Sequence, residues 1–132
     1  MTSVGGKLLR AQAVSGAMTH AVKFAVRRRR PDGGPYSFPS GHTSAAFATA
    51  ATLQRELGWD VGIPAYVIAS YIATSRAAAN KHYVSDLVVG AAIGLVAGRA
   101  VGHVPHTGGA VTVAPLVSAL GTGFTLTWTS KP

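Results

Sequence analysis

The sequence predicts an all-α fold, a helical bundle of about four helices that a small C-terminal β-hairpin could follow. Hydrophobic residues make up 48% of the chain and charged residues only 12%, whereas soluble domains average about 25% charged. Long stretches rich in Ala, Val and Leu suit helices, and clusters of proline and glycine separate these stretches. The length indicates a single domain over residues 1–132, with a core at about 8–102 and a Gly- and Thr-rich tail at 103–132.

The four expected helices are separated by breaks at Pro31–Pro35, Gly58–Asp60 and Asn80–Lys81. They cover Leu8–Arg30, a segment from Ser40 to about Leu57, Val61–Ala79 and roughly Tyr83–Val101. Pro31 ends the first stretch because it lacks an amide hydrogen and restricts the residue before it. Ser40 or Thr43 could cap the second, and Asn80 and Lys81 interrupt the chain before the fourth.

The tail carries a different pattern. Apolar and hydroxyl side chains alternate over Phe124–Trp128, which is typical of a strand with one apolar face. Val111–Val113 is the expected partner strand. The segment from Gly121 to Gly123 is expected to form the turn, so the sequence predicts a hairpin there.

The last two predicted helices raise the question of a membrane. Each has about 18 largely apolar residues, near the lower limit for spanning a bilayer. Gly90, Gly94 and Gly98 recur every four residues, a spacing that allows close approach of helices in lipid or in a soluble bundle. Asp86 and Arg99 would have to face protein or water. Membrane association is the favoured interpretation, and a soluble domain docked to another component is the alternative.

The charge balance indicates an anionic partner. The chain has 12 Lys and Arg against 4 Asp and Glu, a net charge of +8, which favours phosphate esters, anionic lipids or nucleic acid. Nucleic acid is not expected, because the basic residues lack the interleaved aromatic residues of single-strand binders. The absence of cysteine excludes disulfides and cysteine metal sites. The N-terminus lacks the continuous apolar core of a secretory signal.

The first candidate site segment is basic. Lys23, Arg27 and Arg30 are spaced so that they share one face if the helix continues to Arg30. Three cations on one face repel one another unless an anion lies among them. A solvated basic face is the alternative interpretation.

The second segment, Pro39-Ser40-Gly41-His42, opens a helix. Unpaired amides and the positive end of the helix dipole make such a start an anion site. Gly41 lets the backbone approach an anion closely, and His42 could donate a proton to it. A capped turn with a surface histidine is the commoner alternative.

The third segment contains Ser75-Arg76, His82 and Asp86. If the helix begins near Lys81, His82 and Asp86 lie one turn apart on the same face. The carboxylate could then accept one imidazole N–H, which would leave the other nitrogen as a nucleophile. A structural His–Asp pair is the alternative.

Together, Lys23-x6-Arg30-Pro31, Pro39-Ser40-Gly41-His42 and Ser75-Arg76-x5-His82-x3-Asp86 resemble the three-part motif of the type-2 phosphatidic acid phosphatase and vanadium haloperoxidase superfamily. The resemblance covers roughly residues 8–102. It implies that His82 is the nucleophile, that Asp86 orients it, and that His42 is the general acid. It also implies a set of phosphate-binding residues: Lys23, Arg30, Ser40, Gly41 and Arg76. No metal and no other cofactor are implied.

The function that this resemblance implies is a metal-independent phosphatase. Its substrates would be phosphate monoesters or diphosphates, of lipids or isoprenoids above all, and no protein partner is indicated. The alternatives are a vanadate-dependent haloperoxidase and a truncated, non-catalytic module that binds anions or membranes.

The resemblance also bears on completeness and location. Many membrane members have six helices, and too little chain precedes Lys23 for two more, so an N-terminally shortened member is expected. The expected location is the bacterial inner membrane with the site on the periplasmic face, or otherwise the periplasm.

Overall fold

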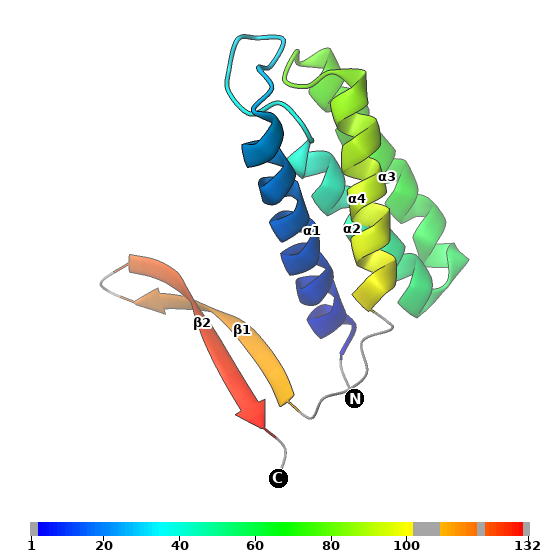
Figure 1. Ribbon diagram of the computed structural model, residues 1–132. Helices are drawn as coiled ribbons and strands as arrows, with labels where there is room; N and C mark the ends of the chain where they lie inside the picture. The colour runs from blue at the N-terminus through cyan, green and yellow to red at the C-terminus, as the bar shows by residue number, and fades with distance from the viewer. Residues whose placement is uncertain (1–2, 102–108, 119–120, 131–132) are drawn as a thin grey trace.

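A computed structural model describes residues 3–101 and, in the tail, the backbone of residues 109–118 and 121–130. Its helical part consists of α1 (Val4–Val26), α2 (Gly41–Leu57), α3 (Trp59–Ala78) and α4 (Val84–Ala100). Figure 1 shows these helices lying side by side in a bundle. The predicted all-α bundle is therefore confirmed.

Helix α2 forms the centre of the bundle, because it packs against each of the other three helices. Its buried side chains are small, among them Ala48, Ala51 and Thr52. Small side chains at a helix contact allow the neighbouring backbones to come close. The core therefore depends on close backbone packing more than on large aliphatic side chains.

The glycine stripe of α4 lies against α2. A Cβ atom added at Gly90 would lie 2.7 Å from the carbonyl oxygen of Ser40, and one at Gly98 would lie 2.7 Å from that of Ala48. At Gly94 it would overlap the carbonyl oxygen of Ser44. Real Cβ atoms do not come this near to backbone atoms, so glycine is required at these positions for α2 and α4 to pack as they do.

Helix α1 ends four residues earlier than the sequence predicts. Arg27 is its C-cap with φ of 50°, and its N–H donates to the carbonyl oxygen of Lys23 at 2.9 Å. Backbone hydrogen bonds hold the following loop together. The Arg30 N–H donates to the carbonyl oxygen of Gly34, and the Ser37 N–H donates to that of Arg28. The predicted helix face shared by Lys23, Arg27 and Arg30 is therefore wrong, and Arg30 approaches Lys23 from the loop.

The connection between α3 and α4 contains the predicted interruption. Asn80 has φ of 54°, in the left-handed region that asparagine tolerates better than most residues. Helix α4 begins at Val84 with Tyr83 as its N-cap, so His82 lies just before the helix. The carboxylate of Asp86 accepts the Tyr83 N–H at 2.7 Å and so caps the start of α4.

The tail forms the predicted antiparallel hairpin, with longer strands than expected. Strand β1 (Gly109–Ser118) pairs with β2 (Gly121–Ser130), and Val111 lies opposite Trp128. The segment Gly121 to Gly123 belongs to β2, so the prediction that it forms the turn is wrong. Its residues pair with residues of β1 and continue the antiparallel ladder. The remaining residues of the predicted tail, together with residue 102 of the predicted core, lie outside the described residues.

Among the described residues, no helix combines the length and the apolar character needed to cross a bilayer. Helix α3 nevertheless carries large apolar side chains on its outer surface. Ile63, Val67 and Ile68 are each 58–63% exposed, and Tyr71 is 72% exposed. This apolar surface is not covered by the other helices.

Candidate active site

The three predicted segments meet at one end of the bundle. Figure 1 shows the loop between α1 and α2 and the loop between α3 and α4 at this same end. A cavity of about 410 Å³ opens there. Of the predicted site residues, it is lined by Lys23, Arg30, Gly41, His42 and His82.

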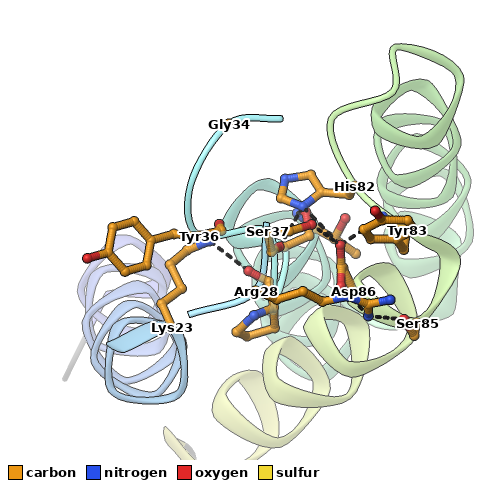
Figure 2. A network of polar contacts seen from close by, with 12 residues as sticks. Lys23, Arg28, Gly34, Tyr36, Ser37, His82, Tyr83, Ser85 and Asp86 are labelled. Atoms are coloured by element: carbon orange, nitrogen blue, oxygen red, sulfur yellow. Dashed lines mark hydrogen bonds and ion pairs between the residues drawn. The ribbon is translucent and has the colours of Figure 1, made fainter. Parts of the chain in front are cut away.

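His82 is buried, and its ring is oriented by the backbone of the loop between α1 and α2. Its Nδ1 atom lies 2.7 Å from the carbonyl oxygen of Ser37. Figure 2 marks contacts of this network with dashed lines. A carbonyl oxygen can only accept a hydrogen bond, so Nδ1 carries the hydrogen. In the neutral ring, Nε2 then has the lone pair.

Asp86 is fully buried behind this histidine. Its Oδ2 atom accepts the Tyr83 N–H and the hydroxyl hydrogen of Ser37. The distance from Oδ2 to Nδ1 of His82 is 3.6 Å, too long for a direct hydrogen bond. We expected Asp86 to accept the hydrogen bond from the imidazole N–H, but the Ser37 carbonyl accepts it instead. Asp86 acts on His82 through its negative charge and by holding Ser37 in place.

Arg28 and Ser37 belong to this network, and the sequence did not identify them. A guanidinium nitrogen of Arg28 donates to Asp86 at 3.2 Å and to Ser85 at 2.7 Å. The same group lies over the ring of Tyr83, 4.1 Å from its centre. Arg28 is one of four consecutive arginines, and spacing alone does not tell which of them turns inward. No sequence pattern marks Ser37.

Lys23 joins the end of α1 to the start of α2. Its Nζ atom donates to the carbonyl oxygens of Tyr36 at 3.0 Å and Pro39 at 2.8 Å. Burial, and next the nearby charge of Arg30, lowers the pKa of Lys23. The Nε atoms of Arg30 and Arg76 are buried without a hydrogen-bond partner. Donors of this kind suit an anion with several oxygen atoms.

The two histidines experience the same positive field. Burial is the largest cause that lowers the pKa of each. Arg30 and Lys23 lower both values further, and Arg76 acts on His42. The hydrogen bond to Ser37 and the charge of Asp86 partly offset this effect at His82. Both rings are therefore held towards the neutral form, and an anion in the cavity would oppose the cations that cause this.

The remaining predicted residues lie around the cavity. Ser40 is fully buried, and its hydroxyl oxygen accepts the Thr43 N–H at 3.3 Å as the cap of α2. Arg76 does not line the cavity, although its charge reaches His42. Arg27 faces a separate hollow beside Arg29. The structure therefore brings together the cations, both histidines and the start of α2, and it places Ser40 and Asp86 in supporting positions.

This arrangement suits a tetrahedral oxyanion. The start of α2 directs amides and a positive dipole end at the cavity, and the cations can neutralise charge spread over several oxygens. A neutral imidazole with a fixed tautomer can act as a nucleophile. The fold and the cavity thus define an α-helical protein with an anion pocket that contains two histidines.

The sequence model of the PAP2 superfamily matches residues 5–110. The chain therefore belongs to the PAP2 superfamily, as its motifs predict.

Two curated relatives share clear sequence similarity with the chain. It is 40% identical over 92 residues to lipid A 1-phosphatase of Porphyromonas gingivalis, covering 66% of this chain and 20% of that protein. It is 33% identical over 101 residues to decaprenylphosphoryl-5-phosphoribose phosphatase of Mycobacterium tuberculosis, covering 69% of this chain and 55% of that protein. The chain thus spans about a fifth and about half of the length of these relatives.

Two solved structures have a similar fold. Aquifex aeolicus LpxE matches with a TM-score of 0.69 and 25% identity, covering 72% of this chain and 64% of that one. A transmembrane PAP2-type phosphatidylglycerolphosphate phosphatase from Bacillus subtilis matches with a TM-score of 0.65 and 27% identity. That match covers 72% of this chain and 55% of the other. These similarities confirm the predicted helical fold of the family.

Proposed function

We propose that the chain is a metal-independent phosphatase that hydrolyses phosphate monoesters or diphosphates through a phosphohistidine at His82. The observation that carries this proposal is the hydrogen bond from His82 Nδ1 to the Ser37 carbonyl. It gives the neutral ring a lone pair on Nε2, in a residue that lines the cavity together with Lys23 and Arg30.

In the first step, Nε2 of His82 attacks phosphorus, and the bond from phosphorus to the ester oxygen breaks. His42 donates a proton to the departing alkoxide. Lys23, Arg30 and Arg76 neutralise the nonbridging oxygens, and this electrostatic contribution dominates phosphoryl transfer. In this proposal Asp86 stabilises the charge that His82 gains.

In the second step, His42 accepts a proton from water, and the resulting hydroxide attacks the phosphohistidine. The bond from phosphorus to Nε2 breaks, inorganic phosphate leaves, and both histidines return to their starting forms. The Gly41 amide helps to bind the phosphate oxygens, as expected for a helix start. Ser40 supports this amide by capping α2.

The proposed substrates are lipid or isoprenoid phosphates. Both curated relatives carry names of phosphatases that act on such molecules, lipid A 1-phosphate and decaprenylphosphoryl-5-phosphoribose. The names also favour phosphoester hydrolysis over haloperoxidation. An apolar substrate is consistent with the apolar outer surface of the helices.

Membrane association is part of the proposal. The exposed side chains of Ile63, Val67 and Ile68 on α3 suit contact with acyl chains, and one relative of known structure is described as transmembrane. We propose the bacterial inner membrane, with the site on its outer face.

A flotation experiment tests this proposal. The chain should rise with phospholipid vesicles, and Val67→Asp combined with Ile68→Asp should reduce the fraction that rises. Equal flotation of the variant and the unchanged chain would contradict a role for α3.

The mechanism is tested by trapping the intermediate. A radiolabelled lipid phosphate should transfer its label to the protein through an acid-labile, alkali-stable bond. His82→Ala should lose both the label and the release of phosphate. His42→Ala should retain label from a substrate with a good leaving group, because its second step is slowed.

The control for these variants is the folded state, measured by circular dichroism and thermal unfolding. A folded His82→Ala protein that releases phosphate as fast as the unchanged chain would overturn the mechanism.

A further inference from the structure

The cavity extends beyond the residues that the proposed mechanism uses. Half of its lining residues belong to α1: Lys23 at the near end and, beyond it, Gln12, Ser15, Gly16, Thr19 and His20. The volume of about 410 Å³ is more than ten times the roughly 30 Å³ that one water molecule takes in the liquid. A phosphate group alone does not fill it, so part of the cavity is available for the rest of a substrate.

The direction of the extension follows from the helix geometry. From Lys23 towards the N-terminus of α1, the lining continues at intervals of about one turn, with Thr19, Ser15 and Gln12. On α2, Ala45 lies one turn beyond His42 and also lines the cavity. The cavity therefore continues from the histidines into the groove between α1 and α2.

This groove is where the leaving group of the reaction would lie. In an in-line displacement, the leaving oxygen departs on the side opposite to the nucleophile. In the proposed mechanism, His82 attacks from one side and His42 protonates the leaving oxygen. His42 lies in the first turn of α2, and Ala45, one turn further along, lines the groove. The atoms attached to that oxygen therefore enter the space between Ser15 and Ala45.

The wall of the groove contains polar side chains from α1 among apolar atoms. The hydroxyl of Ser15 is buried, in a residue 1% exposed, and has no hydrogen-bond partner. Buried hydroxyls in proteins are nearly always paired, so this one is a candidate for pairing with a bound ligand. By contrast, the Thr19 hydroxyl is already paired with Ser44 at 2.9 Å.

Gln12 adds a second polar group with a fixed orientation. Its amide nitrogen donates to the carbonyl oxygen of Ala45 at 2.9 Å and to the hydroxyl of Thr49 at 2.7 Å. With both donor hydrogens used, the side-chain oxygen of Gln12 remains an acceptor, one turn along α1 from the Ser15 hydroxyl, which can donate and accept.

We propose that the groove between α1 and α2 is a leaving-group subsite that selects a hydroxyl-bearing moiety next to the ester oxygen. Ser15 and Gln12 are its specificity-determining residues. Sugars and glycerol share the required chemistry of adjacent hydroxyl groups. This inference rests on the proposed phosphatase function, because it needs the reaction to define the leaving group.

Gly16 offers a way to close the subsite without disturbing the helices. It lines the cavity, and a Cβ atom at this position would meet no other atom within 4 Å. Gly16→Leu should therefore fold and fill part of the groove. Ala17→Leu is the matched control, because Ala17 is the next residue of α1 and is exposed on another face.

The experiment compares phosphate release from glycerol 3-phosphate and glucose 1-phosphate with release from butyl phosphate, which lacks hydroxyl groups. For Ser15→Ala, the ratio of kcat/KM between each hydroxylated ester and butyl phosphate should fall about tenfold, the effect of roughly one hydrogen bond. For Gly16→Leu, kcat/KM should fall for all three esters while inhibition by inorganic phosphate is unchanged. Ala17→Leu should alter neither quantity.

Two results would overturn the subsite. One is an unchanged ratio in Ser15→Ala, and the other is equal weakening of phosphate inhibition and ester turnover in Gly16→Leu. The two hydroxylated esters distinguish a subsite for sugars from one for glycerol.

If the unchanged chain releases phosphate neither from these esters nor from a lipid phosphate, the proposed function fails, and calorimetry still tests the subsite. Glucose 1-phosphate should then bind more weakly to Gly16→Leu than to the unchanged chain, while inorganic phosphate binds both equally. Equal binding of the ester to both proteins would contradict the subsite.

Discussion

The carbonyl oxygen of Ser37 lies 2.7 Å from Nδ1 of His82 and fixes the tautomer of the proposed nucleophile. Ser37 also donates its hydroxyl hydrogen to Asp86. One residue of the loop between α1 and α2 therefore connects the buried carboxylate to the histidine. The orientation of His82 depends on this loop as much as on the segment that leads into α4.

The first prediction concerns Ser37→Ala, which keeps the carbonyl and removes the hydroxyl. Asp86 then loses one donor while buried, and we expect a loss of about 1–3 kcal/mol in the free energy of unfolding. Phosphate release should also slow, since the loop is held less firmly. Chemical denaturation and initial rates measure both effects. Ser70→Ala is the control, because Ser70 is exposed on α3 and makes none of the contacts of this network; it should change stability by about 0.5 kcal/mol or less.

The second prediction concerns Asp86→Asn. The carboxylate accepts hydrogen bonds from Ser37, Tyr83 and Arg28, and an amide presents only one oxygen to these donors. Because the side chain of Arg28 is 39% exposed and can be hydrated, we expect a loss of about 1–3 kcal/mol, below the value for a fully buried ion pair.

The control for Asp86→Asn is Glu56→Gln, which breaks the part-exposed pair with Lys7. It should cost about 1 kcal/mol or less in denaturation experiments. Equal losses for the two variants would show that the buried network has no special role.

Part of this site was predictable from the sequence, because the motif spacings identify residues that bind a phosphate in one family. The spacings could not locate Ser37, whose contribution comes from a backbone carbonyl. They also could not place Arg28, because α1 was expected to continue to Arg30. Arginine favours helices, and no local signal marks the left-handed conformation of Arg27. Two sets of contacts accompany the end of the helix: the following loop pairs with itself, and Arg28 binds Ser85 and Asp86 of α4.

The helix packing was also predictable only in part from the sequence. The repeat of Gly90, Gly94 and Gly98 predicted a close helix contact, since glycine at every fourth position leaves one helix face open to a neighbouring backbone. The repeat does not say which helix is the partner. That partner is α2, in which small residues also recur every four positions, at Ser44, Ala48 and Thr52.

The third prediction uses this contact. Gly94→Ala places a methyl group against the backbone of Ser44 and Ala48, so α2 and α4 must separate. We expect a loss of roughly 1–3 kcal/mol in the free energy of unfolding. Gly16→Ala is the matched control, because it meets nothing within 4 Å and should stabilise α1 by about 0.5–1 kcal/mol. A stabilising effect of Gly94→Ala would contradict the packing of α4 on α2.

The fourth prediction concerns metal chelation. In the proposed mechanism, Lys23, Arg30 and Arg76 supply the positive charge that metal ions supply in metal-dependent phosphatases. Phosphate release should therefore be unchanged after dialysis against EDTA, measured beside a metal-dependent phosphatase that loses its activity. Activity that disappears with EDTA and returns with Mg²⁺ would contradict the proposed chemistry.

The last prediction concerns pH. Burial lowers the pKa of His82 and His42 in the folded chain, whereas the unfolded chain takes up these protons near pH 6.5. Between 6.5 and the lower folded values, the unfolded state binds more protons, so the stability of the folded state rises with pH. The unfolding temperature should therefore fall as pH decreases below about 6.5, and His82→Gln should reduce this dependence. When the pH is lowered, kcat/KM for ester hydrolysis should begin to fall only below pH 6.5, because the proposed nucleophile His82 attacks in its neutral form. A fall that already begins well above pH 7 when the pH is lowered would contradict the lowered pKa of His82.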